Sequence, residues 1–259
     1  KGAQWRWTSP LTLGLFACAA AVLVAWTWWE SRTASPLVDL RTTTRRQVLL
    51  TNAASAVFGF SMFAMSLVSP QILQLPAATG YGLGQSLVVV GLVLAPSGLV
   101  MMSMAPVSAR ISAARGPRTT LITGALVVAV GYGLFTVLMT EIWHLLLVSA
   151  VVGAGIGLAY GAMPALVMAA VPISETAAAN SLNTLMRSIG TSVCSAVAGA
   201  VLAQLTTPFG GVLLPTQNAF RVIMVIGAAA ALAAAGIAFL LPGRRAAVAP
   251  RGKTGATAN

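Results

Sequence analysis

The chain has 259 residues, of which 58% are hydrophobic and only 7% are charged, and its formal net charge is +11. A soluble domain usually carries about 25% charged residues, so this composition excludes a soluble globular protein and predicts an integral membrane protein. The basic residues are scattered through short segments between long apolar runs. This distribution favours lipid headgroups over nucleic acid as the partner of the positive charge.

Apolar runs long enough to cross a bilayer, which takes about 20 residues, recur along the whole chain. We predict seven spanning helices, at residues 11–29, 47–69, 85–107, 119–139, 143–171, 176–205 and 220–241. The predicted fold class is therefore an all-α polytopic membrane protein. Its organisation is one preceding helix within residues 1–29, a charged cytoplasmic loop at 30–46, a six-helix unit at 47–241 and a disordered basic tail at 242–259.

The basic residues also predict the orientation in the membrane. Most of the 15 Lys and Arg residues lie in the tail and in the segments that join the first helix to the second and the third to the fourth. The positive-inside rule places these segments in the cytoplasm together with the C-terminus, so the first helix runs from outside to inside. Because the chain begins at Lys1 without an initiator Met, we expect it to be part of a longer protein.

The sixth predicted helix, residues 176–205, carries an arginine within an apolar run. A guanidinium at the centre of a membrane helix costs roughly 2.5 to 3.5 kcal/mol, so this residue must face protein or water. At the α-helical period, the polar face that contains it comprises Asn180, Asn183, Arg187 and Thr191. A second stripe, of the small residues that allow two membrane helices to pack closely, comprises Ser188, Ser192, Ser195 and Gly199.

The second predicted helix, residues 47–69, combines a narrow polar stripe with Phe and Met side chains. This pattern predicts a wall of a cavity that accepts an apolar ligand. With residues of the fifth helix and of the adjoining loop, the candidate cavity residues are Asn52, Ser55, Phe58, Met62, Ser66, Gln74, Tyr160 and Met163. The alternative, which stays open, is that the small residues only pack against other helices and the Phe and Met side chains face lipid. Helices 119–139 and 220–241 are almost purely apolar and are expected to be peripheral.

The chain lacks the residues that enzymes and cofactor sites usually require. Its glycine-rich segments do not have the spacing of nucleotide-binding loops, and its four Asp and Glu residues all lie in predicted loops or at helix ends. We therefore predict no enzyme activity, no cofactor and no bound metal. Cys18 and Cys194 fall in apolar runs and are expected to be buried apolar residues.

Four stretches, residues 30–40, 73–80, 106–118 and 180–190, occur in this order between or within the predicted helices. In this order they resemble the C-terminal half of a major facilitator superfamily transporter, most closely the bacterial drug:proton antiporters with fourteen helices. An origin from a transporter with twelve helices is equally compatible with the number of spans.

Residues 110–118 look like a degenerate copy of the superfamily's cytoplasmic G-x-L-a-D-R-x-G-R-R loop. Gly116 and Arg118 stand at its Gly and last Arg positions, whereas Ala113 and Ala114 replace its Asp and Arg. The resemblance therefore implies a tight turn and cytoplasmic anchoring without a charge relay, in a loop that contains Arg110, Gly116 and Arg118.

The resemblance implies two inverted three-helix repeats in the six-helix unit. The first helix of each repeat would line the cavity and the second would contact the other half of the transporter. The polar face around Arg187 would then lie at the interface between halves. A proton-coupled transporter generally needs a titratable group inside the membrane, so the coupling carboxylate is expected in an N-terminal half outside this chain.

The implied function is proton-coupled export of amphipathic or cationic small molecules by alternating access, across the inner membrane of a bacterium. Two alternatives stay open. One is a dedicated metabolite or lipid exporter, and the other is a membrane sensor or assembly subunit that does not transport.

Overall fold

The computed structural model describes residues 9–33 and 46–241. Within these ranges, seven helices are long and apolar enough to cross a membrane, which confirms the predicted all-α polytopic class. They are α2 (Pro10–Arg32), α4 (Arg46–Gln74), α5 (Leu87–Arg115), α6 (Pro117–Val137), α7 (Ile142–Met168), α8 (Thr176–Gln204) and α9 (Gln217–Phe239). Most of the predicted loop at 30–46 and the whole predicted tail at 242–259 lie outside the described residues.

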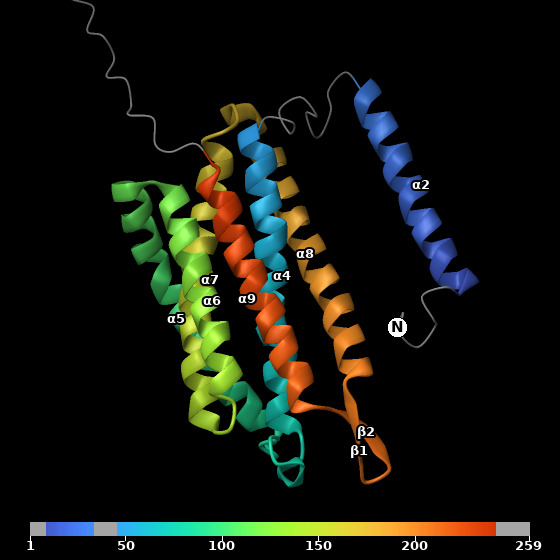
Figure 1. Ribbon diagram of the computed structural model, residues 1–259. Helices are drawn as coiled ribbons and strands as arrows, with labels where there is room; N and C mark the ends of the chain where they lie inside the picture. Colours follow the sequence, from blue (N-terminus) through green and yellow to red (C-terminus); the bar gives the residue numbers. More distant parts are fainter. Residues whose placement is uncertain (1–8, 34–45, 242–259) are drawn as a thin grey trace, which may run out of the picture.

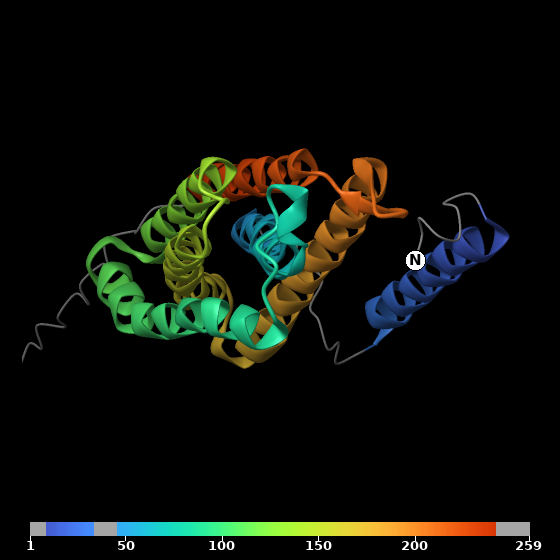
Figure 2. The ribbon, with the colours of Figure 1, turned by 90° about the horizontal axis from the view of Figure 1, so that it is seen from below.

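Helices α4 to α9 form one bundle, and α2 stands to its side in both views (Figures 1 and 2). The side chains of α2 are mostly exposed, including Phe16 and Leu23. The helical backbone satisfies its own hydrogen bonds, so such a segment can lie in lipid. Because its side chains are apolar and exposed, it is stable only in lipid or against another membrane helix.

The six helices of the bundle divide into two repeats, α4–α6 and α7–α9. The closest pairs are α4 with α8 and α9, α7 with α5 and α6, and α6 with α9. The counterparts in the two repeats are α4 and α7, α5 and α8, and α6 and α9. When each helix is replaced by its counterpart, the same set of contacting pairs is obtained. Because α4 and α7 run in opposite directions (Figure 1), the two repeats are inverted with respect to the membrane plane.

The inner faces of α4, α6 and α9 meet in a buried core. The hydroxyl of Tyr132 on α6 donates to the backbone oxygen of Ser61 on α4, and the hydroxyl of Ser61 donates to the backbone oxygen of Gly227 on α9 at 2.9 Å. The apolar helices α6 and α9 are therefore buried on one side. Their outer sides are exposed, for example at Val130 and Leu232.

Helices α4 and α5 end several residues later than the sequence predicts. Helix α4 continues through Pro70 to Gln74, and α5 continues to Arg115. The expected loop at residues 110–118 is in fact the end of α5 and the start of α6, joined at Gly116, whose φ of 88° favours glycine. Pro117 then begins α6, where its missing N–H has no cost.

A short hairpin, which the sequence analysis did not predict, joins α8 to α9. Strand β1 (Thr206–Phe209) pairs antiparallel with β2 (Val212–Pro215). The turn consists of two glycines with φ of 57° and 82°, as a tight hairpin turn of this type requires. The phenol of Tyr81, in the segment between α4 and α5, donates to the backbone oxygen of Pro215 at 2.5 Å and holds the hairpin against the bundle.

Candidate functional site: an apolar pocket and a neighbouring arginine

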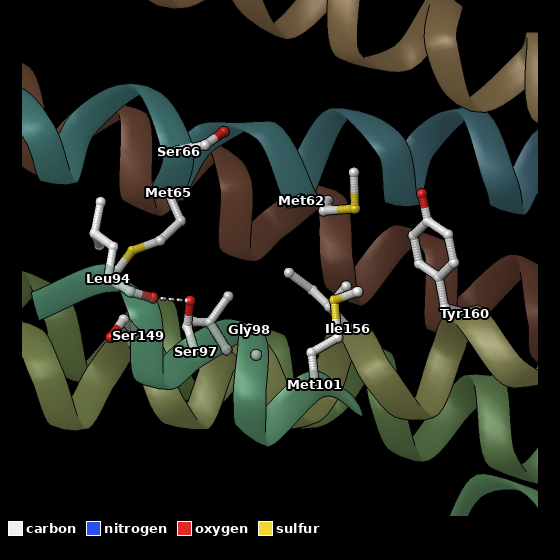
Figure 3. A pocket seen from close by; sticks show the side chains of 12 residues that line it. Met62, Met65, Ser66, Leu94, Ser97, Gly98, Met101, Ser149, Ile156 and Tyr160 are labelled. Atoms are coloured by element: carbon white, nitrogen blue, oxygen red, sulfur yellow. Dashed lines mark hydrogen bonds between the residues drawn. The ribbon is translucent and has the colours of Figure 1, made fainter. Parts of the chain in front are cut away.

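A pocket of about 370 Å³ lies between α4, α5 and α7 (Figure 3). It is lined by Met62, Met65, Ser66, Leu94, Ser97, Gly98, Met101, Ser149, Val152, Gly153, Ile156 and Tyr160. Tyr160 stands at one end and Leu94 at the other. Its wall is mostly apolar with a few hydroxyl groups, a composition that suits the apolar body of a small molecule. The three flexible methionines allow ligands of different shape to fit.

The structure separates the eight predicted cavity residues into three groups. Met62, Ser66 and Tyr160 line the pocket. Gln74 is exposed at the end of α4, where its amide donates to the backbone oxygen of Pro70. The remaining four, Asn52, Ser55, Phe58 and Met163, are buried between helices and do not line the pocket. Asn52 and Ser55 are kept from the pocket because this part of α4 is covered by α8.

Asn183 illustrates that contact. Its Nδ2 donates to the Oδ1 of Asn52 at 3.0 Å and to the Oγ of Ser55 at 2.7 Å, and its exposed fraction is 1%. The residue expected to face the other half of a transporter therefore faces its own bundle. Apolar surroundings favour this placement, because each polar side chain satisfies the others where no water is available.

Two glycines set the distance between α4 and α8. A Cβ atom at Gly190 would lie 1.9 Å from the backbone oxygen of Ala56, and a Cβ at Gly59 would lie 2.4 Å from that of Arg187. The serine and glycine stripe predicted for close helix packing, Ser188, Ser192, Ser195 and Gly199, is exposed at all four positions in the part of the chain that the structure describes. The pairing of Gly59 with α8 could be found only once the rotation of both helices was known.

Arg187 is half-buried beside the pocket. Its Cζ lies 4.5 Å from the ring centroid of Tyr160, which is within the range of a cation–π contact. Its Nη1 lies 3.9 Å from the sulfur of Met163, and its Nη2 lies 3.4 Å from the hydroxyl of Thr184. Every one of these partners is neutral.

The other predicted interface and loop residues are placed as follows. Asn180 is exposed, and the hydroxyl of half-buried Thr191 donates to its own helix at Ser188. Arg110 is exposed on α5. Arg118 donates from Nη2 to the backbone oxygen of Phe239 at 2.6 Å and lies over the ring of that residue, so it caps the C-terminal end of α9. No pattern in the sequence predicts this last contact.

The cysteines differ from the expectation in one case. Cys194 is buried at 1% exposure, as expected, whereas Cys18 is exposed on α2. The difference follows from the isolation of α2, whose apolar side chains have no neighbouring helix among the described residues of the bundle in either view.

The fold and the pocket together define a polytopic membrane protein built from inverted helical repeats. Residues 2–195 match the family model of the Major Facilitator Superfamily. The match covers most of the chain, and the chain belongs to this superfamily of transporters.

Proteins similar to this chain include three from Mycobacterium tuberculosis and Bacillus subtilis. The chain is 26% identical over 204 residues to the multidrug resistance protein Stp of Mycobacterium tuberculosis, an alignment that covers 78% of this chain and 37% of Stp. It is 32% identical over 126 residues to a multidrug resistance protein B homolog of the same species, covering 49% of this chain and 22% of that protein. The multidrug transporter protein MdtP of Bacillus subtilis is 25% identical over 203 residues, covering 78% of this chain and 36% of MdtP. The chain therefore spans little more than a third of the length of Stp and MdtP, and its match to the protein B homolog covers 22% of that protein.

Proposed function

We propose that this chain is the C-terminal part of a proton-coupled exporter of amphipathic small molecules, which works by alternating access between two halves. The observation that carries the proposal is the pocket between α4, α5 and α7. It is large enough to enclose a substantial part of a small ligand, and its methionine-rich wall suits ligands of varied shape. Membership of the superfamily and similarity to multidrug resistance proteins support the same function.

The proposed halves would meet at α5 and α8. In these two helices only 11% and 17% of the most apolar window is buried, compared with 50% or 56% in α4, α6 and α7. A second half placed against α5 would also close the pocket, because Gly98 and Met101 of its lining are exposed. The coupling carboxylate would come from that half, since the two acids whose side chains are described, Glu141 and Glu175, lie at the starts of α7 and α8.

The proposed location is the inner membrane of a bacterium, with the C-terminus in the cytoplasm. Among the described residues, Arg32, Arg46, Arg110, Arg115 and Arg118 lie at the same end of the helices in Figure 1, at the opposite end from the hairpin. This clustering favours that end as the cytoplasmic one. The bilayer would surround α2 and the outer faces of α6 and α9.

Two glycines of α5 provide a matched test. Gly98 lines the pocket and Gly91 does not, and a Cβ at either position would meet no atom within 4 Å. In the full-length protein, Gly98→Leu should reduce efflux of an amphipathic dye about tenfold or more, because the new side chain occupies space needed by the ligand. Gly91→Leu, on the same helix, should leave efflux within about twofold of wild type.

Efflux is measured in energised vesicles, with and without a protonophore. Equal efflux by the two variants would contradict the role of the pocket. Protonophore-insensitive efflux would contradict proton coupling. Complete absence of dye movement in the wild type would instead favour a non-transporting membrane protein.

A further inference from the structure

Arg187 has weaker partners than a guanidinium normally finds. The group carries five N–H donors, and N–H donors usually lie 2.7 to 3.2 Å from an oxygen acceptor. Here the contacts are a sulfur of Met163 at 3.9 Å, a hydroxyl of Thr184 at 3.4 Å and the face of Tyr160. No carboxylate lies within ion-pair distance of Arg187 in the part of the chain that the structure describes. Most of its N–H donors therefore have no short contact to an oxygen acceptor among the described residues.

The position of the guanidinium relates it to the pocket. Tyr160 is both a wall of the pocket and the ring over which the guanidinium lies. In Figure 3 this tyrosine marks one end of the pocket. The backbone oxygen and Cγ of Arg187 lie against Gly59 of α4, which restricts the stem of the side chain, and the residue as a whole is half-buried. A fixed positive charge consequently stands next to one end of an apolar pocket.

The charges around the pocket are unbalanced. Among the described residues, no acidic side chain lines it. A cationic ligand would experience repulsion from Arg187 without attraction from this part of the protein. An anionic ligand would experience the opposite, and a low-dielectric environment strengthens both effects.

We propose that Arg187 binds the acidic group of an amphipathic anion, a carboxylate or sulfonate, whose apolar body occupies the pocket between α4, α5 and α7. This inference rests on the export function proposed above and specifies the charge of its preferred substrate. The planar fork of arginine matches the two oxygens of such a group, and the hydrogen bonds formed are charge-assisted. The weak contacts to Met163 and Thr184 would be exchanged for these bonds, while the stack on Tyr160 can persist.

The test uses two fluorescent probes with the same apolar body. Anilinonaphthalene sulfonate is an anion, and phenylnaphthylamine is its neutral counterpart without the sulfonate. Binding of each probe to purified full-length protein in detergent is measured by equilibrium dialysis, with empty micelles as background. The quantity of interest is the ratio of the two dissociation constants, because a change in folding alters the binding of both probes together.

The inference expects Arg187→Gln to weaken binding of the sulfonate about tenfold or more and to change binding of phenylnaphthylamine less than about twofold. Arg187→Lys, which retains the charge but loses the fork, should lie between wild type and Arg187→Gln. Arg221→Gln is the matched control, because Arg221 at the start of α9 donates to the backbone oxygen of Thr136 and does not line the pocket.

A ratio that Arg187→Gln leaves unchanged would overturn the inference while the proposed export function stands. The same result is expected if a carboxylate of the other half of the transporter forms an ion pair with the guanidinium of Arg187 and so prevents it from binding the sulfonate. A wild-type protein that binds neither probe would overturn both proposals.

Discussion

The side-chain amide of Asn183 on α8 donates to the side-chain oxygen of Asn52 on α4 across 3.0 Å, and both residues are buried. Ser55 accepts a second hydrogen bond from the same nitrogen at 2.7 Å. These bonds join the first helix of one repeat to the second helix of the other. They lie next to the tightest backbone contact between the two helices, at Gly59 and Gly190. The hydrogen bonds of Asn183 and the close glycine contacts thus both hold α4 against α8.

The first prediction concerns this amide. Replacing Asn183 by Ala leaves the polar groups of Asn52 and Ser55 without their partner in an apolar interior, so the full-length protein in detergent should lose about 0.6 to 1.7 kcal/mol of stability. Asn180→Ala, at an exposed position one turn earlier, should change the stability little.

A double-mutant cycle with Asn52→Ala isolates the pair. Because Asn183 bonds to Asn52 directly, the double variant should be less destabilised than the sum of the two single variants. Thermal denaturation followed by tryptophan fluorescence provides the measurement. Strict additivity would show that the bond does not contribute.

The second prediction concerns the glycine contact. Gly190→Ala places a methyl group 1.9 Å from the backbone oxygen of Ala56, so α4 and α8 must separate. We expect a loss of about 1 to 3 kcal/mol, typical of overpacking. Gly236→Ala on α9 is the control, because a Cβ there meets no atom within 4 Å. The fraction of monodisperse protein after extraction reports the difference, and equal behaviour of the two variants would contradict the contact.

The general architecture could be predicted from the sequence because it depends on hydropathy and length alone. Each of the seven predicted spans overlaps one helix, including α7 (Ile142–Met168) for the run at 143–171. The ends were less predictable. Pro70 suggested a loop, but prolines are tolerated inside membrane helices where neighbouring helices compensate.

The site was less predictable than the fold, for a geometric reason. A sequence gives the relative angle of residues on one helix, and on that basis it predicts one polar face for Asn183 and Arg187. It does not give the rotation of that helix in the bundle. Asn183 contacts Asn52 in the buried interface between α4 and α8, whereas Arg187 contacts Tyr160 beside the pocket. Residues of one polar face therefore have two different surroundings.

The third prediction concerns Tyr81 and the hairpin. Tyr81→Phe removes the bond to the backbone oxygen of Pro215, and cleavage in the hairpin by a protease added from outside should become about fivefold faster, as expected for one hydrogen bond. Leu213→Ala, at an exposed hairpin position, is the control and should leave the cleavage rate unchanged.

The same bond predicts a pH dependence. Burial raises the pKa of Tyr81 above its ordinary value of 10.0, so the phenol keeps its proton in the folded state to higher pH than in the unfolded chain. Its contribution is fully present below about pH 10 and is lost as the pH rises through the raised value. The ratio of cleavage rates should therefore stay constant between about pH 7 and 9 and fall only at more alkaline pH. A ratio that changed near neutrality would exclude the phenol as the cause.

The last prediction tests the orientation. Val212 in the hairpin and Ala113 near the end of α5 are both exposed and lie at opposite ends of the bundle. In a variant without Cys18 and Cys194, Val212→Cys should react with a membrane-impermeant maleimide in intact cells, whereas Ala113→Cys should react only after permeabilisation. The physical reason is the cluster of arginines around the α5–α6 junction, which the positive-inside rule places in the cytoplasm. The reverse labelling pattern would show that the protein has the opposite orientation in the membrane. The pocket between α4, α5 and α7 would then open in the opposite direction during transport.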